Sequence, residues 1–219
     1  MAHQEQASAR IALYIGRFSP FHKGHEHVIR RALEKYERVI ILVGSPNVAR
    51  SIKNPFTYEE RRNMIYDAFT EAEGDRIMIG AVPDVPYDDT RWAVGVATMV
   101  DRLTRSQYTD VKFDVYLTGA ERDDSTFYLR MFPQYKMDLV EISEDAVPQH
   151  LSATMIREIY LANSFDGKEV NDKNAEVLLH SLLPSSTRKF LREFKKTEAY
   201  KILCEEYEFI QKYKKQWSV

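Results

Sequence analysis

Residues 16–25 read Gly-Arg-Phe-Ser-Pro-Phe-His-Lys-Gly-His, and they directly follow the apolar run Ile11-Ala-Leu-Tyr-Ile15. An amphipathic stretch comes next at 27–36, so the pattern predicts a strand, a tight turn and a helix in succession. His22 and His25 then stand at the helix N-terminus, where free N–H groups and the helix dipole favour an anion. The decapeptide therefore predicts a phosphate site at the start of the first helix.

Two histidines at this spacing could also be zinc ligands, or could simply cap the helix. A zinc site needs three or four protein ligands. The single cysteine, Cys204, is remote in the sequence, and Glu26 is the only carboxylate beside the histidines. Gly24 places no side chain over the turn, so a phosphate chain can approach the backbone closely. These residues favour phosphate over a metal, and we predict no metal held by protein ligands.

Strands and helices alternate along the next part of the chain. Apolar runs predict further strands at 38–44, 76–82, 112–118 and 135–142, and helical stretches are predicted at 58–72, 91–103 and 125–132. Thr57 and Glu60 form a capping box that begins the helix at 58. This alternation predicts a doubly wound parallel α/β sheet, in which ligands bind beyond the carboxyl ends of the strands.

The pattern changes to helices alone near residue 174. Helical segments are predicted at 177–183, 187–194 and 198–217, punctuated by Pro184 and Thr197. We therefore expect a flexible tail at 1–10, an α/β domain at 11–173 and a helical extension at 174–219 packed on it. Residues 188–219 carry nine Lys and Arg against five Asp and Glu, which is typical of a solvated helical face.

Composition limits the class of protein. A chain of 219 residues should bury roughly 70% of its unfolded surface, and its formal net charge of −2 gives no basic field for nucleic acid. One cysteine forms no internal disulfide, and no apolar run approaches the ~18 residues of a membrane span. The first ten residues lack the apolar core of a signal peptide. We expect a cytoplasmic protein without nucleic-acid or membrane partners; its oligomeric state stays open, a homo-oligomer included.

A second motif, Ser152-Ala-Thr-Met-Ile-Arg157, begins a helical stretch that runs to Ala162. Ser152 is a natural N-cap, and capping alone would explain it. Ser152, Thr154 and the N–H groups of the first turn could equally face a phosphate, with Arg157 one turn further on.

Residues 16–25 resemble the signature of nicotinamide-mononucleotide adenylyltransferases of the archaeal and bifunctional type, in the nucleotidylyltransferase superfamily. The family's Ser-x-Thr-x-Ile-Arg motif is matched at 152–157, and the resemblance covers nearly everything after Arg10. It implies a Rossmann-like nucleotidylyltransferase domain that joins ATP to nicotinamide mononucleotide, giving NAD and pyrophosphate, with Mg²⁺ accompanying ATP. The tail at 207–217 is similar to the stretch that leads into a Nudix hydrolase in two-domain relatives. No Nudix motif is present, so we expect either one activity or a shortened piece.

The resemblance also implies the roles of individual residues. The nucleophile is already an ionised phosphate, so catalysis needs positioning and charge stabilisation rather than a strong base. The expected catalytic residues are His22, His25 and Arg157. Residues expected to bind ATP or phosphate are Gly16, Arg17, Phe18, Gly24, Arg50, Gly119, Ser152 and Thr154. Trp92 is expected to stack on the nicotinamide ring, with Tyr87 and Asp88 beside it.

Some of these assignments have plainer alternatives. The polar loop at 44–57 could be merely solvated; within it, Arg50 is preferred to Lys53 because a guanidinium grips phosphate oxygens in a fork. Trp92 could be a core residue, and Gly119 an ordinary turn glycine. Relatives often read Tyr-Asn-Asp where this chain has Tyr-Asp-Asp at 87–89, which leaves the acceptor less certain than the reaction.

Two other functions stay open at this point. One is a related nucleotidylyltransferase with another acceptor, such as nicotinate mononucleotide, phosphopantetheine or a phosphorylated alcohol; Arg17 and Phe21 favour the nicotinamide acceptor. The other is a nucleotide-binding regulator without turnover, against which the intact His22, His25 and Arg157 argue.

Overall fold

The computed structural model describes residues 8–107, 112–120, 131–141, 148, 151–162 and 173–217. The described residues divide into two compact units. The first unit lies within Met1–Arg17, His27–Asn47 and Phe69–Ala146, and the second within Phe18–Glu26, Val48–Ala68 and Val147–Val219. This division runs through the α/β domain expected at 11–173, and the domain boundaries drawn from the sequence stay a prediction.

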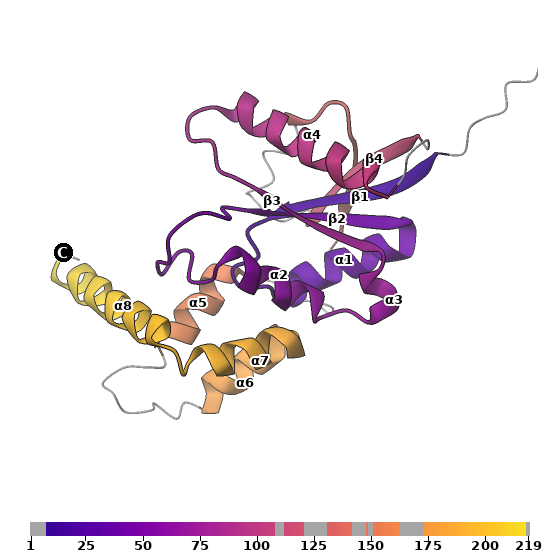
Figure 1. The fold of residues 1–219 in the computed structure, drawn as a ribbon. Coiled ribbons are helices and arrows are strands. Elements are labelled where there is room, and N and C mark those ends of the chain that lie inside the picture. Colours follow the sequence, from indigo (N-terminus) through magenta and orange to yellow (C-terminus); the bar gives the residue numbers. More distant parts are fainter. Residues whose placement is uncertain are drawn as a thin grey trace, which may run out of the picture. The chain divides into compact units, whose positions relative to one another are not determined.

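Five parallel strands form the sheet of the first unit (Figure 1). They are β1 (Ala9–Gly16), β2 (Arg38–Gly44), β3 (Ile77–Val82), β4 (Phe113–Ala120) and β5 (Lys136–Val140). Their order in the sheet is β3-β2-β1-β4-β5, and every neighbouring pair is parallel. The predicted strands are confirmed with ends shifted by up to two residues, and so is the doubly wound sheet.

Helices α1 (Lys23–Lys35) and α4 (Asp89–Arg105) cover opposite faces of this sheet (Figure 1). Val96 of α4 is fully buried in one core cluster with Leu13 of β1. On the other face, Tyr36 follows α1 and its ring lies 4.9 Å from that of Tyr116 on β4. Because successive strand residues point to opposite faces, strands buried on both sides read as continuous apolar runs.

The single helix predicted at 58–72 is wrong: the segment forms two helices, α2 (Tyr58–Tyr66) and α3 (Glu71–Gly74). Thr57 and Glu60 make the predicted capping box, and α2 begins there. Thr70 and Glu73 make a second capping box, which starts a new helix. The sequence keeps a helical periodicity across this break, so periodicity did not predict it. The local hydrogen bonds of Thr70 determine where the new helix begins.

The second unit is helical. Besides α2, it contains α5 (Ala153–Ala162), α6 (Lys173–Leu182), α7 (Ser185–Phe194) and α8 (Glu198–Trp217). The hydroxyl of Tyr160 on α5 donates to the Leu191 carbonyl on α7 (2.8 Å), and that of Tyr200 on α8 donates to the Tyr160 carbonyl (3.0 Å). Phe56, just before α2, contacts Phe190 of α7 edge to face. The helices after residue 173 therefore share one core with α2 and α5, and the predicted helical C-terminal region is confirmed.

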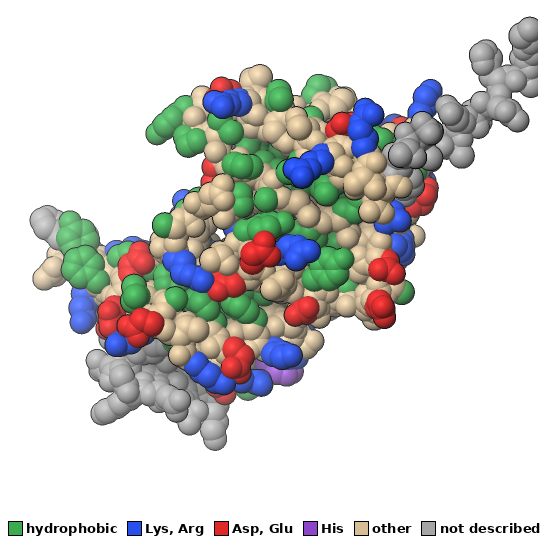
Figure 2. Space-filling view, viewed as in Figure 1, with side chains coloured by type: hydrophobic (Ala, Val, Ile, Leu, Met, Phe, Trp, Pro, Cys, Tyr) green, Lys and Arg blue, Asp and Glu red, His purple; other side chains and the backbone are tan. Residues whose placement is uncertain are grey.

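Basic and acidic side chains are interspersed over the face of the molecule shown in Figure 2, in keeping with the net charge of −2. Across the described ranges, no helix combines the length and apolar character needed to span a membrane. Most of the helix predicted at 125–132 lies outside the described residues.

Candidate active site

The turn between β1 and α1 is built on buried aromatic rings. Phe18 and Phe21 are both almost fully buried, and Phe18 adopts a left-handed backbone with φ of 51°. The Phe18 ring lies edge-on to the imidazole of His25, with 4.8 Å between ring centroids. Phe18, predicted to bind ATP, thus forms part of the wall that holds a histidine. A sparsely populated conformation such as that of Phe18 persists only where its surroundings fix it.

His22 and His25 form a stacked pair. Their ring centroids are 3.6 Å apart with 18° between the planes. The His22 N–H donates to Nδ1 of His25 (3.3 Å), and the His25 N–H donates to Nδ1 of His22 (3.4 Å). A nitrogen that accepts a hydrogen bond carries no proton, so each neutral ring holds its proton on Nε2. The pair therefore offers two Nε2–H donors.

The protonation of this pair is controlled by its surroundings. Burial lowers the pKa of His25 well below its usual range, and the charge of the neighbouring His22 lowers it further. His22 itself is buried. The resting pair therefore does not carry two positive charges, and an incoming anion would favour protonation.

Gly24 leaves room for the side chain of His22. A Cβ at this position would lie 3.1 Å from both Cε1 and Nδ1 of His22. The imidazole of His22 therefore packs beside this glycine, and the expected approach of a phosphate chain to the turn stays a prediction. Glycine is needed here because any side chain would displace that ring.

Arg157 joins the second motif to the histidine turn. Its Nη1 donates to the Ser19 carbonyl (2.7 Å), and its Nη2 donates to Oγ1 of Thr154 (3.0 Å). Ser152 accepts from the Met155 N–H (3.2 Å), which confirms the expected N-cap of α5. The structure thus brings together His22, His25, Arg157 and their motifs, although 138 positions separate Ser19 from Arg157.

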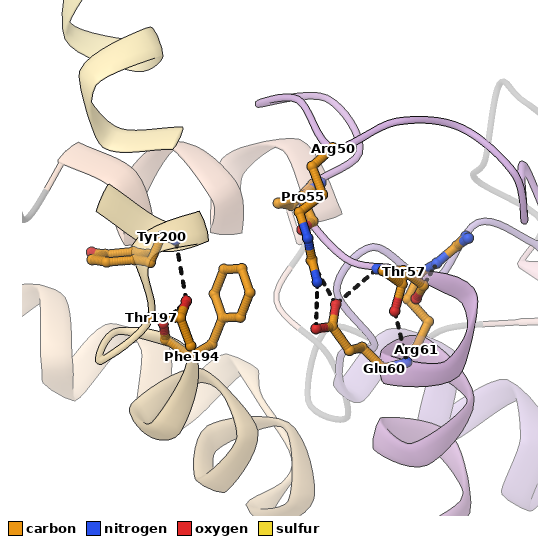
Figure 3. A network of polar contacts seen from close by, with 8 residues as sticks. All are labelled: Arg50, Pro55, Thr57, Glu60, Arg61, Phe194, Thr197 and Tyr200. Carbon is orange, nitrogen blue, oxygen red and sulfur yellow. Dashed lines mark hydrogen bonds and ion pairs between the residues drawn. The ribbon is translucent and has the colours of Figure 1, made fainter. Parts of the chain in front are cut away.

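Arg50 has a more specific environment than the sequence predicted (Figure 3). Its Nη1 and Nη2 each donate to one carboxylate oxygen of Glu60 at 2.7 Å, and Nη1 also donates to the Pro55 carbonyl at 2.6 Å. The guanidinium lies over the ring of Phe194, 5.2 Å from its centroid. Burial would raise the pKa of Glu60, but hydrogen bonds from Arg50 and from the Thr57 N–H hold it below its usual range. Lys53 is exposed and makes no ion pair with the described residues.

In the first unit, Gly16 and Gly119 lie at the carboxyl ends of β1 and β4. These strands are neighbours, with Tyr14 opposite Thr118, and the strand order reverses between them. That reversal is the position where open α/β sheets bind ligands. Arg17 follows β1 and is exposed. Oγ1 of Thr118 is buried without a hydrogen-bond partner among the described residues.

The residues expected beside nicotinamide lie around the start of α4. Asp88 is the N-cap of that helix and accepts from the Arg91 N–H (2.8 Å). Trp92 is half-buried, and its ring lies 5.8 Å from that of Phe132 at the border of the core. Tyr87 is fully exposed and has a φ of 65°. The position of Trp92 suits a packing role on one side of its ring and leaves part of the indole accessible.

Sequence reasoning missed three contributors to the site. Glu60 was identified only as a helix cap, Phe194 only as part of a helix, and the carbonyl of Ser19 not at all. The capping box was the one local signal for Glu60. Arg50 and Glu60 pair across an irregular loop, ten positions apart. A helical or strand period in the sequence does not predict such a pair.

Comparison with known proteins gives concordant matches. The family model for cytidylyltransferase-like proteins matches residues 13–171. The chain is 35% identical over 195 residues to a nicotinamide/nicotinic acid mononucleotide adenylyltransferase of Acinetobacter baylyi, covering 89% of this chain and 92% of the relative. It is 30% identical over 203 residues to a nicotinamide-nucleotide adenylyltransferase of Thermococcus sibiricus, covering 90% of each.

Among solved structures, the chain is similar to a bifunctional NMN adenylyltransferase/ADP ribose pyrophosphatase from Francisella tularensis, complexed with AMP and a manganese ion. The TM-score is 0.72 at 28% identity. The match covers 95% of this chain and 56% of that one, so this chain spans little more than half the length of the bifunctional protein.

Proposed function

Because this chain belongs to the cytidylyltransferase-like family, we propose that it transfers the adenylyl group of ATP to nicotinamide mononucleotide, giving NAD and pyrophosphate. Two relatives matched over about nine-tenths of their length carry names for this reaction. The observation that carries the proposal is the stacked histidine pair, held in the same unit as an arginine that anchors the turn. Such a site offers hydrogen-bond donors to phosphate.

The proposed reaction is a single displacement at phosphorus. An oxygen of the mononucleotide 5′-phosphate forms a bond to the α-phosphorus of ATP, and the bond from that phosphorus to the bridging oxygen breaks. The electron pair leaves with pyrophosphate. Negative charge grows on the α-phosphoryl and leaving oxygens, where Nε2–H donors of His22 and His25 and the guanidinium of Arg157 would stabilise it.

Further residues are proposed to hold the substrates. Ser152 and Thr154 stand at the first turn of α5, whose N–H groups favour a phosphate. Gly16, Arg17 and Gly119 are proposed to contact ATP near the point where the strand order reverses. Gly24 acts indirectly, by leaving room for His22.

Magnesium is proposed to enter with ATP. Nowhere in the described ranges do three or more His, Cys, Asp or Glu side chains form a group that could hold a metal ion. Phosphate oxygens and water are the usual ligands of Mg²⁺ in nucleotide complexes, so the ion needs no protein cage. The manganese ion in the Francisella tularensis structure supports use of a divalent ion by that relative.

The nicotinamide ring is proposed to stack on the accessible part of Trp92, with Tyr87 and Asp88 beside it. Nicotinate mononucleotide is the second candidate acceptor, because the Acinetobacter baylyi relative is named for both mononucleotides. The cytoplasmic location expected from the sequence belongs to the same proposal.

An acceptor panel tests this function. The purified chain is incubated with magnesium, with ATP or CTP, and with nicotinamide mononucleotide, nicotinate mononucleotide or phosphopantetheine. Pyrophosphate and the nucleotidylated product are then measured. We expect NAD formation that depends on the divalent ion. Equal product in excess chelator would refute the role of the ion, and a strong preference for phosphopantetheine or for CTP would refute the assigned substrates.

A further inference from the structure

Some of the N–H donors of Arg50 fix its guanidinium to neighbouring protein groups. A guanidinium has five N–H groups. Nη1 uses its two on the Pro55 carbonyl and Glu60, and Nη2 uses one on Glu60. The Nε–H and the second N–H of Nη2 meet no partner among the described residues, and both lie along one edge of the planar group. Such an edge matches two oxygens of a phosphate.

Glu60 is itself fixed, so it can orient the arginine. Its Oε2 accepts from the Thr57 N–H (2.8 Å), while its own N–H donates to Oγ1 of Thr57 (3.3 Å). The first bond holds the carboxylate at the start of α2, and the second, from the Glu60 backbone, completes the capping box (Figure 3). The side chain is 23% exposed, against 32% for Arg50. A partly desolvated bidentate pair of this kind sets the direction of the guanidinium as well as its place.

Phe194 supports the same guanidinium from the C-terminal helices. Its ring is buried, and it packs edge-on against Phe56, with 5.3 Å between centroids. Arg50 lies over this ring at a distance typical of a cation–π contact. Residues on α2 and on α7 therefore fix one loop side chain together.

We propose that Glu60 and Phe194 are positioning residues, which orient Arg50 so that its Nε–Nη2 edge receives a phosphate group of a substrate. This inference rests on the proposed function. It gives the helices after residue 173 a part in substrate binding, through Phe194. The phosphate could belong to ATP or to the mononucleotide, and the two Michaelis constants distinguish them.

A competing idea predicts the opposite effect on phosphate binding when the charge of Glu60 is removed. If Glu60 merely occupied Arg50 and had to release it, removing the carboxylate charge would free the arginine and tighten phosphate binding. If Glu60 orients Arg50, the same change loosens the guanidinium and weakens binding. Glu60→Gln separates the two, because glutamine still supports a capping box but its amide can accept only through one oxygen.

The experiment measures kcat and both KM values for wild type, Glu60→Gln and Arg50→Ala, and for the double variant. We expect Glu60→Gln to raise the KM of one substrate about tenfold with a smaller change in kcat, as loss of a charged hydrogen-bond contact would. In the Arg50→Ala background, Glu60→Gln should change that KM less than twofold, since Glu60 acts through Arg50. Phe194→Leu should raise the same KM severalfold.

Glu59→Gln is the matched control. Glu59 is the adjacent residue on α2; its side chain is 70% exposed and 3.9 Å from Arg62, so the variant makes the same charge change away from the loop. Its KM values should equal those of wild type. Thermal unfolding of each variant establishes that it is folded.

An unchanged or lowered KM in Glu60→Gln overturns the proposal. The proposal also fails if Glu60→Gln raises KM just as much in the Arg50→Ala background as in wild type. If Glu60→Gln does not fold, an unchanged KM in Phe194→Leu overturns it instead. Failure of the wild type to make NAD would refute the proposed function, which is a separate outcome.

Discussion

Gly24→Ala should disable the histidine pair while leaving the fold largely intact. The added Cβ would lie 3.1 Å from Cε1 and Nδ1 of His22, against 3.4–4 Å for an ordinary contact, so the ring must move by a few tenths of an ångström. His22 is stacked on His25 at 3.6 Å and shares two hydrogen bonds with it, so the movement disturbs both rings. Overpacking of this kind costs about 1–3 kcal/mol.

The effect on catalysis should be a fall in kcat of about ten- to hundredfold, because donors aimed at the transition state lose their alignment. Steady-state assays of NAD formation, together with thermal unfolding, measure both quantities. Gly95→Ala is the control: a Cβ there meets nothing within 4 Å, and alanine in this exposed turn of α4 should stabilise the protein by up to ~1 kcal/mol. If Gly24→Ala kept kcat and instead raised the KM for ATP, the space would belong to a phosphate after all, and our reasoning would be refuted.

Two further predictions concern His25 and Trp92. Because the pKa of His25 is lowered in the folded protein, the unfolded chain binds more protons just below pH 6.5. The free energy of unfolding should therefore fall as the pH drops through this range, and urea denaturation should show a flatter pH dependence for His25→Asn. Trp92→Ala should raise the KM of nicotinamide mononucleotide by up to about thirtyfold, with that of ATP nearly unchanged and much of the loss recovered in Trp92→Phe. Equal weakening of both substrates in a destabilised Trp92→Ala would instead make Trp92 a core residue.

The strands and most helices could be predicted because their burial leaves a direct mark on the sequence. β2 is buried on both faces, and its run of five apolar residues at 39–43 identified it with the observed bounds. The break between α2 and α3 escaped prediction, since it depends on hydrogen bonds of Thr70 rather than on periodicity. The ends of elements shifted by a residue or two because terminal hydrogen bonds fray and leave no periodic mark on the sequence.

The site was predictable where its residues lie close together in the sequence. The spacing of His22 and His25 on a helix start sufficed to place them side by side. The pairing of Arg50 with Glu60 and Phe194 could not be predicted, because it joins a loop to two helices through side chains whose meeting depends on the whole second unit. Gly24 shows the intermediate case: the need for glycine was evident, but its physical reason was visible only once the ring of His22 was placed.

The most direct test of the account compares the initial rate of NAD formation by wild type and by His22→Ala, at saturating ATP, nicotinamide mononucleotide and magnesium. The account places Nε2–H of His22 against charge that grows in the transition state. It therefore predicts a kcat lower by about 10²–10³ in a variant that remains folded. A folded His22→Ala that forms NAD at the wild-type rate would contradict the central claim.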